Sequence, residues 1–287
     1  TGPDRATGRI AGLPPGPAAK AAQAFFHVLA AEPRVGMREL HLVLDDVGLG
    51  KYHYLQSLII GGICLSDGAE ILVSSSVLGA LQANWHMDGM LKGTLMSMIF
   101  VGVCMGNLVG GYLADVHGRR VVVLGSYLGI CAFGALTALA NGPRSMLTLR
   151  FLFGFSFGTG VGPGVALQVE SAPAAWRGHL LNLGSVFFAV GEVYTALLLL
   201  VFMPQLSDPT ATRWRSVTLL AVLPGAVLMP FAFLLLQESP HFLLAKGRQA
   251  EAAAVVRHIA QTNGREGALP SLEEGAAPAP EAALEAE

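Results

Sequence analysis

Charged residues are scarce in this sequence of 287 residues. Asp, Glu, Lys and Arg make up 13% of the chain, and hydrophobic residues make up 53%, whereas a soluble domain carries about 25% charged residues. The formal net charge of −2 argues against a nucleic-acid partner. The composition therefore predicts an integral membrane protein whose surroundings are a lipid bilayer.

Sequence motifs for ATP hydrolysis and for metal binding are also lacking. The chain contains no Walker A loop and no His-Glu-x-x-His motif, so ATP hydrolysis and zinc proteolysis have no sequence support. Three cysteines, Cys64, Cys104 and Cys131, fall inside apolar runs without metal-ligand spacing. We expect a protein that is not an enzyme and that holds no cofactor, no metal and no disulfide framework.

The segment 111–120 places its charged residues between two long uncharged runs. Residues 94–112 and 121–140 contain no charge, and each run has about 20 residues, enough to cross a hydrocarbon core of about 30 Å as a helix. The pair Arg119 and Arg120 marks the intervening loop as cytoplasmic under the positive-inside rule. The two runs therefore predict neighbouring spans joined by a tight cytoplasmic loop.

The spacing Gly-x-Leu-Ala-Asp-x-x-Gly-Arg-Arg in this loop resembles the signature loop between helices 2 and 3 of the major facilitator superfamily of transporters. The matched positions are Gly111, Asp115, Gly118, Arg119 and Arg120. Gly118 allows the turn, and Asp115 can cap the following helix or pair with an Arg across the loop. Val116 stands where the family usually has a basic residue. The resemblance implies a cytoplasmic gating role for the matched residues, and the plainer reading is a loop whose charges only set topology.

Two further cytoplasmic segments resemble sugar-porter-type and organic-ion transporters. Residues 170–178 match the phrase Glu-x-x-Pro-x-x-x-Arg-Gly, in which Glu170 can pair with Arg residues of the first loop or with Arg177. Residues 237–243 resemble the phrase Pro-Glu-Ser-Pro-Arg-x-Leu, and they keep Glu238 but carry His241 in place of the Arg. The resemblance implies that these acids belong to a charge network that opens and closes the cytoplasmic side. Residues 45–52 resemble the lead-in of synaptic vesicle 2-related proteins.

The predicted fold is an all-α membrane bundle of six transmembrane helices, which is one half, a 3+3 inverted repeat, of a major facilitator fold. The expected spans are residues 54–81, 93–113, 121–140, 146–169, 180–203 and 216–236. Both ends then lie in the cytoplasm, and prolines 163, 224 and 230 are expected to kink their helices. Gly102, Gly106 and Gly110, four residues apart, predict a smooth stripe for close helix packing. The predicted regions are a disordered segment 1–44, the bundle 45–243, a cytoplasmic amphipathic helix 244–264 and an acidic disordered tail 265–287 rich in Ala and Pro.

Four ionisable residues fall inside the predicted spans. Asp67 and Glu70 lie three positions apart and share one helix face, and each charge in a span costs about 2.5–3.5 kcal/mol on insertion scales. The pair is either a proton, cation or substrate site or a structural pair bound to a basic partner. Arg150 either reaches the outer surface or faces inward, toward an anionic substrate or these carboxylates. Glu192 is either a substrate or proton residue or a hydrogen-bond partner of Tyr194 or of a backbone group.

The leading hypothesis is alternating-access transport of a small organic solute: an organic ion, a niacin-like carboxylate or a sugar. Proton symport through the span carboxylates is the expected coupling. A second six-span half, either a C-terminal half or a second copy of this chain, would complete the transporter. We expect a multi-pass membrane protein that is located in the plasma membrane or in a vesicle membrane. The rival hypothesis is a half-length membrane interaction protein that does not transport, and a membrane enzyme is a distant third.

Overall fold

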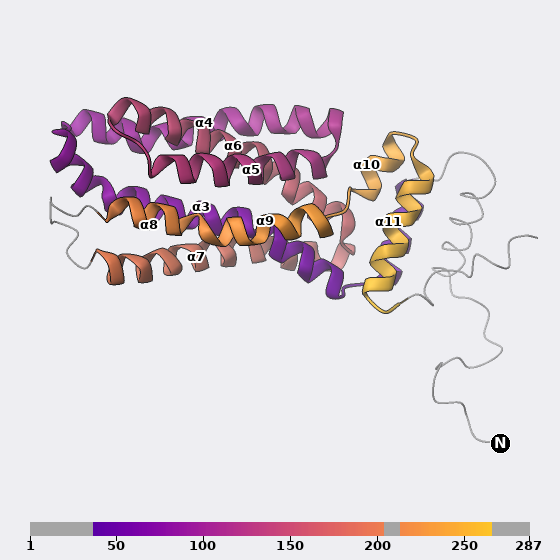
Figure 1. The fold of residues 1–287 in the computed structure, drawn as a ribbon. Coiled ribbons are helices and arrows are strands. Elements are labelled where there is room, and N and C mark those ends of the chain that lie inside the picture. The colour runs from indigo at the N-terminus through magenta and orange to yellow at the C-terminus, as the bar shows by residue number, and fades with distance from the viewer. Residues whose placement is uncertain (1–36, 204–212, 266–287) are drawn as a thin grey trace, which may run out of the picture.

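The computed structural model describes residues 37–203 and 213–265, and every regular element within them is a helix. The elements are α2 (Met37–Val47), α3 (Lys51–Trp85), α4 (Gly89–His117), α5 (Arg119–Thr137), α6 (Pro143–Ser171), the 3-10 turn η1 (Ala174–Trp176), α7 (Arg177–Phe202), α8 (Trp214–Ala221), α9 (Leu223–Leu235), α10 (Pro240–Ala245) and α11 (Gln249–Thr262). Helices α3 to α9 form an elongated bundle, and α2, α10 and α11 gather at one end of it (Figure 1).

Six helical segments in the described chain are long and apolar enough to cross a membrane, as predicted. They are Lys51–Gln82, Gly89–His117, Arg119–Thr137, Pro143–Ser171, Ala174–Phe202 and Trp214–Leu235. The sixth span is broken at Val222 into α8 and α9, beside Pro224, where a kink was expected. Helices α6 and α9 continue through Pro163 and Pro230.

The end of the bundle that was expected on the cytoplasmic side contains more helix than the sequence predicted. The region expected to be disordered up to residue 44 contains helix α2 from Met37, and the helix expected at 244–264 is α11, preceded by the short α10. Leu40, Val43, Leu44 and Val47 of α2 are buried against α10 and α11. Their spacing is that of an amphipathic helix, and burial of this face holds α2 in place. Residues 1–36 and the predicted tail from 266 onward lie outside the described residues.

Helices α4 and α6 form the most extensive helix pair of the described chain, because glycines let their backbones meet. Gly102, Gly106 and Gly110 of α4 face the backbone carbonyl oxygens of Phe151, Phe155 and Thr159 of α6. Gly154 and Gly158 of α6 face carbonyl oxygens of α4 in return. A side chain at these glycines would collide with the partner backbone. The three α4 glycines, expected from their four-residue spacing to form a packing stripe, line this contact.

One proline within α6 fits the same contact. Pro163 lacks an N–H, so the carbonyl of Thr159, four residues earlier, has no helical donor. The Gly110 position of α4 lies directly against that carbonyl oxygen, where a Cα–H group can make a weak hydrogen bond. The proline and the facing glycine therefore act together at this crossing.

Candidate transport site and cytoplasmic gate

The centre of the bundle holds a buried ion pair between α3 and α6. The Nη1 atom of Arg150 lies 2.6 Å from Oε2 of Glu70, and the two side chains are only 3% and 1% exposed. Of the two orientations considered for Arg150, the structure shows the inward one. The pairing offsets part of the cost of placing each charge in the membrane.

The polar atoms around this pair are incompletely satisfied. Oδ1 of Asp67, Oε1 of Glu70 and Nη2 of Arg150 are buried and have no hydrogen-bond partner among the described residues. Asp67 is 6% exposed and lies three residues before Glu70 on α3. Because unsatisfied buried polar atoms are rare in proteins, this cluster is suited to receive a proton, a water molecule or a polar group of a solute.

Glu192 lies on the helix that packs against this part of α3, because its neighbour Gly191 meets the Leu65 carbonyl and Thr195 donates to the Ala69 carbonyl. It is half-buried on α7, and no hydrogen bond or ion pair within the described chain joins it to Asp67, Glu70 or Arg150. Tyr194, which the sequence offered as its partner, instead donates to the backbone carbonyl of Leu220, at 2.8 Å. The structure therefore brings together three of the four predicted intramembrane residues.

Sequence reasoning missed a second set of buried polar residues at the seam of α3 and α6, between the start of α3 and the end of α6. His53, Gln56 and Ser57 of α3 meet Gln168 and Ser171 of α6 there. The side-chain amide of Gln168 donates to Ser57 Oγ at 2.6 Å, and His53 Nε2 lies 3.0 Å from the Ser171 carbonyl. The signal was present in the sequence, because the polar positions 56 and 57 follow 53 by three and four residues, and the polar positions 67, 70 and 74 are again spaced three and four residues apart within α3.

A small cavity opens beside this polar seam. It has a volume of about 30 Å³, and its lining includes Ser57, Cys64, Gln168 and Gly184. This volume is enough for about one ordered water molecule. The cavity lies between the seam and the Asp67 turn of α3.

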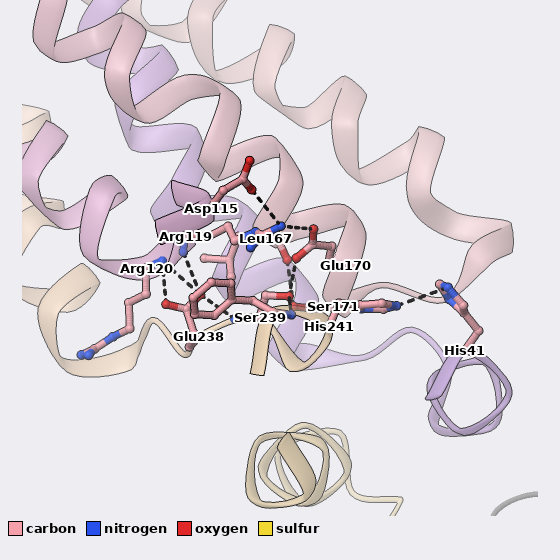
Figure 2. Close-up of polar contacts among 11 residues, drawn as sticks. His41, Asp115, Arg119, Arg120, Leu167, Glu170, Ser171, Glu238, Ser239 and His241 are labelled. Atoms are coloured by element: carbon pink, nitrogen blue, oxygen red, sulfur yellow. Dashed lines mark hydrogen bonds and ion pairs between the residues drawn. The ribbon is translucent and has the colours of Figure 1, made fainter. Parts of the chain in front are cut away.

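The predicted cytoplasmic residues meet in one network at the end of the bundle (Figure 2). The guanidinium of Arg119 lies 3.2 Å from Glu170 and 3.6 Å from Asp115, so Asp115 pairs with an Arg. Ser239 donates its hydroxyl to Glu170, and Arg119 also stacks on the Phe242 ring, 5.0 Å from its centroid. The network joins α4, α5 and α6 to the segment after α9.

Glu238 holds the start of α5. Its carboxylate accepts the backbone N–H groups of Arg119 at 3.0 Å and of Arg120 at 3.2 Å, which are donors that a helix N-terminus leaves free. Gly118 just before them has φ +101°, a conformation that other residues rarely adopt. Arg120 extends back to the carbonyls of Leu236 and Phe233 at the end of α9.

Two matched residues lie outside these ion pairs. Arg177 does not reach Glu170, one of its predicted partners; its guanidinium donates to the Ala172 carbonyl at 3.3 Å and contacts His41 of α2. Gly111 borders open space, so nothing in the described chain requires a glycine there.

Residues 154–158 read Gly-Phe-Ser-Phe-Gly, the spacing of a serine-hydrolase nucleophile turn. These residues lie inside the continuous helix α6, and Ser156 donates to the Leu152 carbonyl one turn earlier. A nucleophile turn needs a sharp strand-to-helix bend, which this helix does not provide. The serine is therefore a packing residue at the α5–α6 contact, where it faces Gly129.

Comparisons with known proteins agree with this architecture. The family model described as "Sugar (and other) transporter" matches residues 64–282. The synaptic vesicle 2-related protein of Xenopus laevis is 31% identical over 223 residues, covering 77% of this chain and 39% of the relative. Organic cation/carnitine transporter 7 of Arabidopsis thaliana is 29% identical over 221 residues, covering 77% of this chain and 42% of the relative. This chain thus spans less than half the length of either relative.

The fold is also that of a solved transporter. The proton:xylose symporter XylE of E. coli, a major facilitator superfamily protein, superposes with a TM-score of 0.67 at 19% identity, covering 78% of this chain and 52% of XylE. The family model, the two sequence relatives and the six apolar helices all indicate a family of membrane transporters. This multi-pass membrane protein belongs to the sugar (and other) transporter family.

Proposed function

We propose that this chain forms one six-helix body of a transporter that moves a small organic solute by alternating access. The observation that carries the proposal is the buried cluster of Asp67, Glu70 and Arg150, with unsatisfied polar atoms at the centre of the bundle. The chain belongs to a family of transporters, and transporters of this fold bind their solutes near the membrane midplane. Both facts support a role in transport for this cluster. The second six-helix body is supplied by the remainder of a longer protein or by a second copy.

We further propose that proton binding in this cluster is coupled to transport. When Glu70 is ionised, it holds Arg150; when Glu70 takes up a proton, the hold on the guanidinium weakens and Arg150 can meet an anionic group of the solute. Asp67, one helical turn away, is a second carboxylate that can receive the proton. A similar fold in a proton:xylose symporter is consistent with such coupling. Glu192 on α7, which forms no hydrogen bond or ion pair with the cluster in the described chain, is a candidate for a further solute contact.

The cytoplasmic network supplies the gate in this proposal. Arg119 pairs with Glu170 and Asp115, and Glu238 holds the start of α5, so the helices are tied together on this side. Breaking these pairs as the two bodies rock would open the cytoplasmic side. Their half-buried, water-accessible position makes the pairs reversible, because a surface ion pair contributes only about 0–1 kcal/mol.

The test is solute uptake by the full-length protein that contains this chain, reconstituted in liposomes with an acidic exterior. Radiolabelled nicotinate, carnitine and xylose serve as probes of the three solute classes. Wild type is compared with Asp67→Asn, Glu70→Gln and the control Asp88→Asn, in which the exposed cap of α4 keeps a good capping residue.

The expected result is gradient-driven uptake of one probe, retained by Asp88→Asn and lost in Glu70→Gln. Absence of uptake for all three probes, with or without a gradient, would overturn the transport proposal for these solute classes. Uptake by Asp67→Asn and Glu70→Gln with unchanged gradient dependence would leave transport standing and overturn the carboxylate assignment.

A further inference from the structure

A pair of histidines joins helix α2 to the cytoplasmic gate. The ring centroids of His41 on α2 and His241 on α10 are 4.6 Å apart, and their Nε2 atoms are 3.3 Å apart. The Nδ1 atom of His41 lies 2.9 Å from the guanidinium of Arg177, at the start of α7. Figure 2 shows His41 reaching His241 beside the Ser239–Glu170 contact. The pair thus connects the helix before the membrane to the segment that carries the gate.

The hydrogen bonds assign the protons of both rings. Arg177 can only donate, so Nδ1 of His41 accepts and its proton resides on Nε2. That Nε2–H then donates to Nε2 of His241, whose own proton resides on Nδ1. The chain from Arg177 through His41 to His241 works only while His241 is neutral. Protonation of His241 places an N–H on each of the two facing Nε2 atoms, so the hydrogen bond between the rings is lost.

The surroundings also oppose a charge on His241. Burial, then the His41 ring, and the cationic Arg177 and Arg119 lower the pKa of His241 to about 4, and the backbone carbonyl of Glu170 acts in the opposite direction. Nδ1 of His241 is buried and has no hydrogen-bond partner among the described residues.

The carboxylates of the neighbouring elements are engaged elsewhere. Glu170 on α6 binds Arg119 and Ser239, Glu238 caps α5, and Asp45 on α2 accepts the backbone N–H of Ala174 at 2.7 Å. Asp115 on α4 is paired with Arg119. No carboxylate in the described chain is therefore placed to stabilise a protonated His241.

We propose that His41 and His241 form a pH-sensitive latch that docks α2 on the cytoplasmic gate at neutral pH and releases it in acid. The latch goes beyond the transport proposal, and its docking does not depend on which solute is carried. Released α2 would expose the apolar face that covers α10 and α11, and it would free Arg177 from His41. The segment after α9, which carries Glu238, Ser239 and His241, could then move without displacing α2.

The expected pH dependence of α2 docking follows from the lowered pKa of His241. A group whose pKa is lower in the docked state makes docking fully favourable above its ordinary pKa, and docking weakens as pH falls toward the docked value. Here the window runs from about 6.5 down to about 4. Between pH 7.5 and pH 5.0 the ratio of undocked to docked α2 is expected to rise about 30-fold.

Hydrogen–deuterium exchange of the full-length protein in lipid nanodiscs measures this ratio directly. The readout is the protection factor of residues 37–47, corrected for the intrinsic pH dependence of amide exchange, with α5 as an internal reference. Wild type is compared at pH 7.5 and 5.0 with two uncharged variants, His241→Phe and His241→Gln, and with one permanently charged variant, His241→Arg. His179→Phe, which removes a cytoplasmic-side histidine that contacts Tyr54 and Trp176, is the matched control.

The expected result is an approximately 30-fold fall in α2 protection for wild type and His179→Phe at pH 5.0. His241→Phe or His241→Gln should show no pH dependence, and His241→Arg should leave α2 unprotected at both pH values. Wild-type protection that does not change with pH would overturn the latch. A pH-dependent fall that persists in both neutral variants would show that another group titrates and would overturn it equally.

Discussion

At the scale of single residues, the buried Glu70–Arg150 pair dominates the interior. Both charges lie in the membrane-spanning part, and each compensates the other at 2.6 Å. Asp67, on the same face of α3, has no such partner among the described residues. The three residues therefore make different contributions to stability, although all are buried and ionisable.

Glu70→Gln is expected to lower the free energy of unfolding by about 3–5 kcal/mol, because it leaves the buried Arg150 charge without its partner. Asp67→Asn should not lower stability, since it removes a carboxylate with an unsatisfied oxygen. Thermal unfolding of the purified full-length protein in detergent measures both. Replacing the pair together, as Glu70→Leu with Arg150→Met, should recover most of the loss. A Glu70→Gln protein as stable as wild type would contradict the pairing.

Tyr194 compensates for a proline in the neighbouring helix. Pro224 lacks the N–H that would bond the Leu220 carbonyl four residues earlier, and the Tyr194 hydroxyl donates to that carbonyl at 2.8 Å. Tyr194→Phe should therefore cost about 1 kcal/mol of stability. In a Pro224→Ala background, where the helix can supply its own donor, the same change should cost measurably less. Equal costs in the two backgrounds would reject this explanation.

The sequence predicted individual residues better than their partners. The matched loop motifs placed Asp115, Arg119, Glu170 and Glu238 on the same side of the membrane, and the structure joins them at one end of the bundle. For Arg150, two orientations were open, because a sequence does not say whether a long side chain faces lipid or a neighbouring helix. The contact between His41 and His241 joins positions 200 residues apart in sequence, a separation over which local patterns carry no information.

At the scale of elements, the glycine contact between α4 and α6 is the clearest case of sequence determining packing. The four-residue spacing of Gly102, Gly106 and Gly110 predicted a smooth face, and the structure places that face on the α6 backbone. The identity of the partner helix could not be predicted, since α6 carries its own glycines but so do α3 and α5.

Gly106→Ala should destabilise the protein, because the added Cβ would collide with the backbone of Phe155 on α6. Gly125→Ala on α5 is the matched control: its Cβ would meet nothing within 4 Å. The control should be neutral or stabilising by about 0.5–1 kcal/mol, since Ala favours helix more than Gly does. Thermal unfolding of the two proteins side by side checks the prediction, and an equal or greater loss in the control would contradict it.

Helix α2 could not be predicted from hydropathy alone. Its length of 11 residues is too short for a span, and charged residues interrupt its sequence. The apolar positions 40, 43, 44 and 47 nevertheless follow the amphipathic helical pattern. The pattern could have predicted a helix, but its docking on α10 and α11 depends on a hydrophobic cluster assembled from both ends of the described chain.

At the scale of the whole molecule, hydropathy was enough to predict six spans. The cytoplasmic side of the loops stays a prediction from the positions of the Arg residues. Bilayer thickness restricts the length of each span, which makes this level of structure the easiest to predict. The curated relatives compared here are more than twice as long as the matched part of this chain. Coupled transport is therefore tested on the full-length protein.

The most direct test of the central claim is the reverse of gradient-driven uptake. If solute and proton transport are coupled, an inward solute gradient must drive protons inward in liposomes that start without a pH gradient, because linkage between two ligands is reciprocal. A pH-sensitive dye enclosed in the liposomes reports this flux when nicotinate, carnitine or xylose is added outside. The account predicts that one of these solutes acidifies liposomes containing wild type or Asp88→Asn and that it leaves those containing Glu70→Gln unchanged. Acidification that is equal in Glu70→Gln, or solute entry without any acidification in wild type, would contradict a proton-coupled site at the Glu70–Arg150 pair.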